Sequence, residues 1–427
     1  MSPDQRSNRL LSSLPASARR LLPGVGDAGT AAARCSPLRA GRSAPGLTRE
    51  QPRGPDAPLA RPFWGGCRLV VVALTVLALG RPAHAAAAPA VATPAPDDGA
   101  ALYARYCALC HGARGQGYAA DHANALANQQ FLVAASDPFL GWAIAYGRPG
   151  TPMAAFGKDR GGPLDHGQIS KLITFIRSWQ QSPPIALKEG LIRGEPARGE
   201  KLYAGQCAGC HGVRGKGKTA PSLNNPVLLA TASDSYLRYA MAEGRAGTPM
   251  PAFKGKLSGD KLDDLTAYLR SLYRKLEWKT VPETPPPITQ IVINPKGGPP
   301  RFPPLREGLF VPVDTVKAEL TRGARLVLLD ARPTSDWMLA HIPGALPVPY
   351  YDVDKMVSSL PRDDTFIVAY CSCPHAASGQ VVSELRSRGF KNTAVLDEGI
   401  FVWMERGYPV TTGTGESPPA PTPASDR

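Results

Sequence analysis

The chain has 427 residues, which at roughly 150 residues per domain predicts about three domains. Its 45 prolines and 43 glycines make roughly a fifth of the chain, against a usual share of about 12%, and this excess excludes a single compact domain. The net charge of +14 is concentrated in residues 1–85, which carry twelve arginines, no lysine and four acids. A nucleic-acid-binding function inferred from basic charge therefore loses most of its support. Eight cysteines are too few for a disulfide scaffold in a chain of this length.

The amino-terminal segment predicts export. Residues 1–62 show no sustained helical or strand period, so we expect a disordered basic extension there. Residues 63–85 combine a basic flank, an apolar run from Leu69 to Leu79 and small residues after it, which is the pattern of a secretory signal peptide. The run is shorter than the about 20 apolar residues of a membrane-spanning helix. The alternative is an uncleaved anchor, and in both cases we expect the rest of the chain in the periplasm or otherwise outside the cytosol.

Two segments of the chain repeat each other. Both contain, in the same order, a Leu-Tyr pair, a Cys-x-x-Cys-His motif, a Gly-Thr-Pro-Met motif and an apolar helical pattern. In the first copy these are Leu102-Tyr103, Cys107 to His111, Gly150 to Met153, and Ile169, Leu172, Ile173, Ile176 and Trp179. In the second copy they are Leu202-Tyr203, Cys207 to His211, Gly247 to Met250, and Leu262, Leu265, Leu269 and Leu272. Spacings of three and four residues predict one buried helix face at the end of each copy.

The Cys-x-x-Cys-His motif predicts covalent attachment of a c-type haem in each copy. On one helical turn the two thiols can bind the two vinyl groups, and the adjacent imidazole then faces the iron. The residues that hold haem are Cys107, Cys110 and His111 in the first copy and Cys207, Cys210 and His211 in the second. A zinc site would need a second ligand pair, which accompanies neither copy, and a thioredoxin-like redox site would need a βαβ unit. We therefore expect two covalently attached haem c groups.

The repeat also predicts the sixth iron ligand. Met250 is equivalent to Met153 in the same Gly-Thr-Pro-Met setting, whereas Met241 is equivalent to Ile144 and is expected in the core. His122 has no clear counterpart in the second copy. It is a rival candidate for the sixth ligand, but a histidine in a solvated loop is several times more common, so we expect it there. Iron with histidine and methionine ligands has no open position, which suits single-electron transfer rather than catalysis.

With these motifs, residues 97–183 and 196–276 each resemble the class I cytochrome c family. The resemblance implies two small all-α domains, each enclosing a haem between the motif-bearing helix and a methionine loop. It implies redox partner proteins and no nucleic acid. A membrane would be contacted only through the signal segment, if that segment stays uncleaved.

A proline-rich linker is expected over residues 281–305, where proline clusters favour extended chain. Beyond it the pattern predicts strands at 326–330, 366–370 and 393–396 and a helix at 381–388. This alternation predicts an α/β domain with a parallel sheet covered by helices on both faces. Residues 413–427 are expected to form a disordered tail.

Residues 307–412 resemble the rhodanese family of sulfurtransferases. The matching positions are Asp330-Ala-Arg332, His341 to Ala345, Cys371 at a strand end, Glu398-Gly399, Trp403 and Gly407 to Pro409. The resemblance implies that Cys371 takes a sulfane sulfur as a persulfide, stabilised by loop N–H groups and by the dipole of the following helix. Thiosulfate or persulfide donors would then be partners. The family often has an arginine five residues after the cysteine, where this chain has Ala376, and His375 is a partial substitute.

Cys373 adds alternatives at this site. It could resolve a persulfide on Cys371, form a strained disulfide with it, or hold a soft metal together with Cys371 and His375, so these three are the candidate catalytic residues. The expected function is that of an exported dihaem cytochrome whose rhodanese-like domain binds or transfers sulfane sulfur. One rival is a pure electron carrier in which the third domain is an inactive docking module. The other is a haem enzyme, such as a thiosulfate-oxidising two-haem cytochrome.

Overall fold

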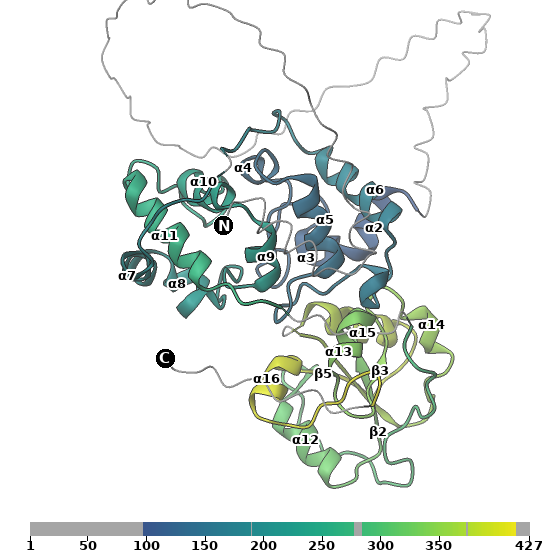
Figure 1. Cartoon of the computed structure of the whole chain (residues 1–427). Helices are drawn as coiled ribbons and strands as arrows, with labels where there is room; N and C mark the ends of the chain where they lie inside the picture. Colours follow the sequence, from purple (N-terminus) through teal and green to yellow (C-terminus); the bar gives the residue numbers. More distant parts are fainter. Residues whose placement is uncertain (1–96, 189, 277–283, 373–374, 416–427) are drawn as a thin grey trace, which may run out of the picture. The chain divides into compact units, whose positions relative to one another are not determined.

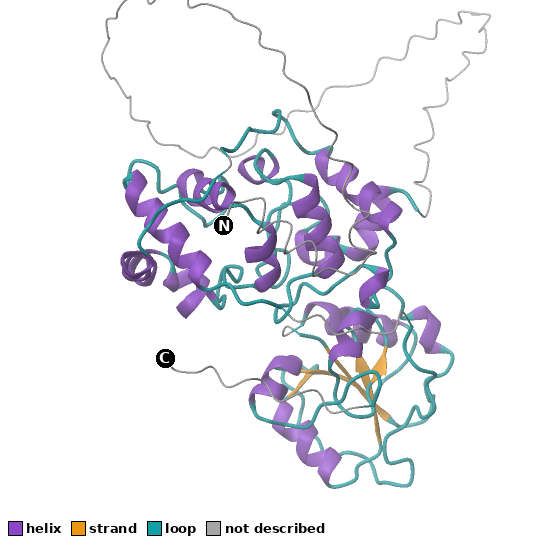
Figure 2. Ribbon diagram, viewed as in Figure 1, coloured by secondary structure: helices purple, strands orange, loops and turns teal. Residues whose placement is uncertain are grey.

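The computed structural model describes residues 97–188, 190–276, 284–372 and 375–415. The predicted basic extension, the signal segment and most of the predicted tail lie outside the described residues. Two helical segments are followed along the chain by an α/β segment (Figure 1), and every strand drawn in Figure 2 belongs to that third segment. Within the described ranges, no helix is both long enough and apolar enough to cross a bilayer.

The first helical segment contains the predicted amphipathic helix. Its elements are α2 (Gly99–Tyr106), α3 (Ala108–His111), α4 (Gln129–Leu132), α5 (Asp137–Tyr146), the 3-10 turn η2 (Lys158–Arg160) and α6 (His166–Arg177). Ile169, Leu172 and Ile176 on α6 are all buried, as the spacing predicts. The helix begins after a capping box, in which the Asp165 carboxylate accepts from Gln168 N at 2.9 Å and the Gln168 side chain accepts from Asp165 N at 3.0 Å. This pair satisfies two backbone donors that would otherwise lack partners at the helix start.

The second helical segment has the same order of α-helices, but its 3-10 turn follows the second helix, whereas η2 of the first segment precedes the last helix. Its elements are α7 (Pro196–Gln206), α8 (Ala208–His211), the 3-10 turn η3 (Val213–Gly215), α9 (Pro226–Thr231), α10 (Asp234–Glu243) and α11 (Gly259–Ser271). Leu262, Leu265 and Leu269 lie on the buried face of α11, and Leu272 is buried directly after it. The repeat seen in the sequence is therefore a repeat of structure.

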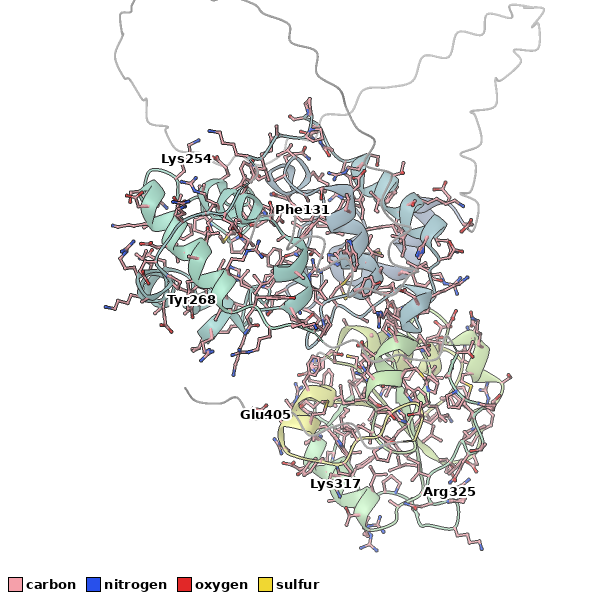
Figure 3. The ribbon with its side chains drawn as sticks, in the orientation of Figure 1. Phe131, Lys254, Tyr268, Lys317, Arg325 and Glu405 are labelled. Atoms are coloured by element: carbon pink, nitrogen blue, oxygen red, sulfur yellow. The ribbon has the colours of Figure 1, made fainter. Side chains whose placement is uncertain are left out.

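In each helical segment the first helix crosses the last at a glycine. A Cβ atom added at Gly99 would lie 2.4 Å from the carbonyl oxygen of Lys171, and one added at Gly199 would lie 2.0 Å from the carbonyl oxygen of Asp264. Only glycine permits so close an approach of two helix backbones. On α11, Tyr268 (Figure 3) stands beside this crossing. The crossing fixes the helix that precedes the Cys-x-x-Cys-His motif against the carboxyl-terminal helix of its segment.

The α/β segment forms a parallel five-stranded sheet with the order β1-β5-β4-β2-β3. Its strands are β1 (Phe310–Val311), β2 (Leu326–Asp330), β3 (Leu346–Pro347), β4 (Phe366–Tyr370) and β5 (Thr393–Leu396). The three predicted strands are confirmed at β2, β4 and β5. Sequence analysis missed β1 and β3, which have two residues each and therefore show no periodicity.

Helices cover both faces of this sheet, as expected. They are α12 (Val313–Thr321), α13 (Thr334–Leu339), α14 (Asp354–Val357), α15 (Ala376–Ser387) and α16 (Gly399–Glu405). One apolar core joins side chains of α14 and α15 to one face of the strands, and a second joins α12 and α16 to the other face. Trp403 on α16 is 1% exposed and belongs to the second core.

Part of the expected linker packs against the α/β segment. Ile293 pairs with the start of β2, donating to and accepting from the backbone of Leu326 at 2.8 and 3.2 Å. The Phe302 ring lies 5.0 Å from that of Phe366 on β4. Isolated apolar side chains between prolines are thus partly buried against the domain that follows them, which composition alone does not predict.

Candidate functional site

The two Cys-x-x-Cys-His motifs have the same backbone geometry. The helical path is interrupted at Cys107 (φ −120°, ψ −35°) and at Cys207 (φ −120°, ψ −36°), and a single turn, α3 or α8, follows. In both turns the histidine N–H donates to the carbonyl of the first cysteine at 2.9 Å. Each turn therefore carries two thiols and an imidazole together, as covalent haem attachment requires.

Both motif histidines are oriented by a backbone carbonyl. Nδ1 of His111 lies 2.8 Å from the carbonyl oxygen of Asn124, and Nδ1 of His211 lies 2.8 Å from that of Pro221. A carbonyl only accepts hydrogen bonds, so Nδ1 carries the proton and Nε2 keeps the lone pair that would bind iron. Burial lowers the pKa of both imidazoles, which favours the neutral form needed of a ligand.

Three of the motif thiols have a raised pKa and are therefore protonated at neutral pH. Burial raises the pKa of Cys107 to about 12 and that of Cys207 to about 11. The pKa of Cys110 is raised to about 12 by burial and then by Asp121, whose carboxylate lies 3.7 Å from Sγ. A redox-active cysteine needs a lowered thiol pKa, so these environments fit haem attachment better than a thioredoxin-like redox site.

The two methionine loops close in the same way. Arg148 N donates to the carbonyl of Met153 at 2.7 Å, and Arg245 N donates to that of Met250 at 3.0 Å. Both methionines are partly buried against the helical core. The backbone N–H of each methionine donates to the hydroxyl of the threonine two residues earlier, Thr151 or Thr248, at 3.2 Å. Met241 is buried within α10, as expected of a core residue. Thioether donors in matching loops, together with the two neutral imidazoles, fit a histidine–methionine haem site in each segment.

An arginine on the last helix braces each segment, and sequence analysis missed it. Arg177 donates to the Asp137 carboxylate at 2.7 Å and to the carbonyl of Leu132 at 2.6 Å. Arg270 makes the equivalent bonds to Asp234 and to the carbonyl of Leu229. The signal was available, since both arginines and both aspartates occupy equivalent positions of the repeat.

Cys371 lies at the carboxyl end of β4, at the start of the loop that leads to α15. Its side chain is buried, with Sγ 3.3 Å from the hydroxyl of Ser378 in the first turn of α15. Its carbonyl accepts from Ile400 N at 2.9 Å, which ties the loop to α16. A thiol at the amino-terminal end of a twelve-residue helix is positioned to carry negative charge on sulfur.

His375 is paired with a carboxylate. Nε2 lies 3.2 Å from the Asp397 carboxylate, and the ring packs against Phe310 with centroids 4.1 Å apart. Burial lowers the pKa of His375 although Asp397 opposes this, so the ring is largely neutral at pH 7. Ala376 supplies no charge at the position where the family often has arginine. Cys373, the third candidate, lies outside the described residues.

The other residues of the rhodanese resemblance stabilise the fold. Asp330 at the end of β2 accepts from Arg332 Nε at 2.9 Å and Nη2 at 2.6 Å. Burial disfavours the charged guanidinium, but Asp330 outweighs it and raises the pKa of Arg332. Burial also raises the pKa of the neighbouring Asp336 to about 6. His341 stacks on Trp337 at 3.9 Å and is bonded through Nδ1 to the carbonyl of that residue.

The first haem motif contacts the α/β segment close to Cys371. Tyr350 Oη donates to the carbonyl of Tyr106 at 2.6 Å, and the rings of Tyr106 and Tyr351 lie 4.8 Å apart. Leu109, between the two motif cysteines, packs against the core that contains Cys371. The Cys371 thiol also contributes to the raised pKa of Cys110, after burial and Asp121. Sequence analysis missed these tyrosines, because nothing in the local pattern indicates a partner so distant along the chain.

Comparison with known families agrees with this geometry. Residues 94–176 and 194–269 match the family described as cytochrome c oxidase, cbb3-type, subunit III, and residues 313–406 match the rhodanese-like domain. The chain therefore joins cytochrome c domains to a rhodanese-like domain, which confirms the two resemblances and the multidomain fold.

Individual relatives and solved structures are similar to parts of the chain. The cbb3-type cytochrome c oxidase subunit FixP of Bradyrhizobium diazoefficiens is 31% identical over 194 residues, which are 43% of this chain and 63% of that protein. The chain spans about three fifths of the length of this and the next two such relatives. The cytochrome bc1 complex cytochrome c subunit of Mycobacterium bovis is 27% identical over 254 residues, covering 54% of this chain and 82% of that protein. The solution structure of a rhodanese-like domain from Anabaena sp. is 29% identical, covers 29% of this chain and 88% of its own, and has a TM-score of 0.24.

Proposed function

We propose that this protein is an exported dihaem c-type cytochrome that transfers single electrons and carries a sulfane-sulfur site on its rhodanese-like domain. The observation that carries the dihaem proposal is the repeated imidazole geometry, with Nδ1 of His111 and of His211 each 2.8 Å from a backbone carbonyl. The proposed haem-binding residues are Cys107, Cys110, His111 and Met153 for one haem, and Cys207, Cys210, His211 and Met250 for the other. When bound, each haem supplies one-electron redox chemistry.

The proposed division of the chain follows the sequence. The cytochrome domains span 97–183 and 196–276, and the rhodanese-like domain spans 307–412. Export rests on the signal-like segment 63–85, which lies outside the described residues. Redox partner proteins are proposed because relatives are named as subunits of cytochrome oxidase and bc1 complexes.

Haem content tests the first part of the proposal. Protein from a host that attaches haem c should give two haems per chain in a pyridine haemochrome assay, and the intact mass should show both attached. Cys107→Ser with Cys110→Ser should leave one haem, and the equivalent pair Cys207→Ser with Cys210→Ser should leave the other. A mature chain with four unmodified thiols at these positions would end the proposal.

Cys371 is the proposed acceptor of sulfane sulfur. Its thiolate would attack the outer sulfur of thiosulfate, so that a new S–S bond forms to Cys371 while the S–S bond of thiosulfate breaks and sulfite leaves with its electron pair. The neighbouring Ser378 hydroxyl and the start of α15 would stabilise the persulfide anion. The intact protein should transfer sulfur from thiosulfate to cyanide, and Cys371→Ser should not.

Coupling between the two chemistries is supported by the packing of Leu109 against the core that holds Cys371. Oxidation of the persulfide would supply the electrons: Cys371–S–S⁻ and water would give Cys371–S–SO⁻, two protons and two electrons, one for each haem. Thiosulfate or a persulfide should therefore reduce the haems of the intact protein, whereas the haems of Cys371→Ser should stay oxidised. Ser372→Ala is a matched control, because it changes the neighbouring buried residue and keeps the thiol. Equal haem reduction in the intact protein and in Cys371→Ser would remove the coupling.

A second function is favoured by Ala376 and by the pairing of His375 with Asp397, which leave the loop without the family's usual cation. In this alternative the protein is an electron carrier and its rhodanese-like domain is an inactive docking module. Normal haem redox behaviour with no sulfur transfer to cyanide would select it.

A further inference from the structure

Two equivalent asparagines link the cytochrome segments to each other. Asn128 precedes α4 and Asn225 precedes α9, at the same position of the repeat. Each uses its side-chain oxygen to cap its own helix: Asn128 Oδ1 accepts from Phe131 N at 3.0 Å, and Asn225 Oδ1 accepts from Leu228 N at 3.2 Å. This assigns the other side-chain atom, Nδ2, as a donor that is not used for capping.

In both cases Nδ2 reaches the methionine loop of the other segment. Asn128 Nδ2 donates to the carbonyl of Ala246 at 2.8 Å, and Asn225 Nδ2 donates to the carbonyl of Pro149 at 3.0 Å. Ala246 and Pro149 are themselves equivalent, since each lies four residues before the loop methionine. The contact is therefore reciprocal: each segment holds the loop of its neighbour by the same bond.

Both asparagines are buried, and equivalent aromatic residues of the two segments also contact each other. Asn128 is 9% exposed and Asn225 is 2% exposed. Phe139 and Tyr236, which are equivalent, meet across the contact with ring centroids 4.9 Å apart. A single apolar core contains buried side chains of both segments.

The loop arginines complete the contact. Arg148 lies over the Phe139 ring at 5.5 Å, and Arg245 lies over the Tyr236 ring and over the Phe131 ring (labelled in Figure 3), each at 5.9 Å. Burial lowers the pKa of Arg148 to about 10. These arginines are also the residues whose N–H groups close the methionine loops.

We propose that Asn128 and Asn225 are positioning residues that act across the domain boundary: Asn128 holds the loop of Met250, and Asn225 holds the loop of Met153. The proposal rests on the assignment of these methionines as axial ligands. Each haem site is then completed by a hydrogen bond from the other domain, so loosening one domain weakens methionine ligation in its neighbour. An asparagine that acted only as a helix cap would affect its own domain.

The test uses the full-length, haem-loaded protein with Asn128→Ser and Asn225→Ser. Serine keeps the cap but lacks the amide N–H groups that reach the other loop. In Asn128→Ser, amide hydrogen exchange should accelerate about fivefold in residues 244–250 and stay unchanged in 147–153. Asn225→Ser should show the opposite pattern. Ser136→Ala and Ser233→Ala, which remove caps of α5 and α10, are the matched controls and should act within their own segments.

A second readout separates this proposal from the ligand assignment. Imidazole competes with methionine for haem iron, and its apparent affinity should rise about fivefold at the haem of the domain opposite the substitution. The imidazole-binding signal of each haem is assigned by comparison with Met153→Leu and Met250→Leu. If those variants leave imidazole binding unchanged, the assignment of the methionines as ligands fails. The hydrogen-exchange data would still show whether the asparagines hold the loops of the opposite segment.

Effects confined to the substituted domain, or no effect in either domain, would overturn the proposal. Gln130→Ala is a further variant, and it leaves both asparagine caps intact. Gln130 belongs to the first segment and accepts from Ala246 N at 3.2 Å, so it contacts the same loop as Asn128. The variant should loosen residues 244–250 in the same direction as Asn128→Ser.

Discussion

Two methionines of the second cytochrome segment occupy different environments. Met241 is buried inside α10, whereas Met250 ends a loop whose backbone closes on itself. Only the second environment recurs in the first segment, at Met153. The repeat therefore distinguishes the proposed iron ligand from a core residue of the same type.

Met250→Leu should lower the reduction potential of the second haem by on the order of 100 mV, because axial ligation sets haem potentials over about 0.8 V and leucine cannot bind iron. Redox titration of the full-length protein measures this. Met241→Leu conserves volume in the core and should leave both potentials in place. A shift in the Met241 variant alone would show that the two roles are reversed.

The raised pKa of Asp336 predicts that the stability of the rhodanese-like domain depends on pH. Burial raises this pKa from 3.8 to about 6, so folding favours the protonated acid, and stability should fall as pH rises from about 4 to about 6. Asp336→Asn should therefore raise the free energy of unfolding at pH 7 by roughly 1–3 kcal/mol and have little effect at pH 4. Native-state hydrogen exchange of the β2 amides measures the free energy of unfolding at both pH values. An equal gain at the two pH values would mean that ionisation is not the cause.

At the scale of secondary-structure elements, the helix crossing is the feature that holds each haem motif in place. Gly199 lets α7 meet α11, and the same contact recurs between α2 and α6 at Gly99. Because α7 leads directly into the motif turn α8, a shift of the crossing would move Cys207 and His211 together. The stability of the second cytochrome segment and the geometry of its Cys-x-x-Cys-His motif therefore both depend on Gly199.

Gly199→Ala should destabilise the second cytochrome segment by roughly 1–3 kcal/mol, since the added methyl group would lie 2.0 Å from the carbonyl oxygen of Asp264. Thermal unfolding of the holoprotein followed by circular dichroism measures the loss. Gly205→Ala is the control on the same helix: a Cβ there meets no atom within 4 Å, and alanine should stabilise the helix by about 0.5–1 kcal/mol. Equal effects of the two substitutions would refute the steric argument.

For the whole molecule, the contact between the first Cys-x-x-Cys-His motif and the rhodanese-like domain carries the proposed coupling of sulfur and haem chemistry. It combines the bond from Tyr350 to Tyr106, the Tyr106–Tyr351 ring pair and an ion pair between Arg105 and Asp352. Ser335 Oγ adds a bond to the carbonyl of Ala155 at 2.6 Å. Polar groups satisfied across a boundary in this way favour one arrangement over others.

Tyr350→Phe should weaken this contact by about 0.5–1.5 kcal/mol, because the ring remains while the bond to the Tyr106 carbonyl is lost. Hydrogen exchange in residues 104–111 should become faster in the full-length protein. Tyr408→Phe removes a bond to Asp314 within the rhodanese-like domain and should leave these residues unchanged. Unaltered exchange in Tyr350→Phe would show that the hydroxyl does not hold the boundary.

The amino-acid sequence by itself determined the local features. The motif spacing, the repeat, the α6 and α11 faces and the strands β2, β4 and β5 all depend on neighbours within a few turns or one strand, so their patterns are visible along the chain. The tertiary structure alone decided which groups complete the sites. The carbonyls of Asn124 and Pro221 that orient the histidines, the reciprocal bonds of Asn128 and Asn225, and the Tyr350 contact have no sequence signature, because a backbone oxygen is common to every residue. Which one lies within hydrogen-bonding distance is settled only when segments distant along the chain pack together.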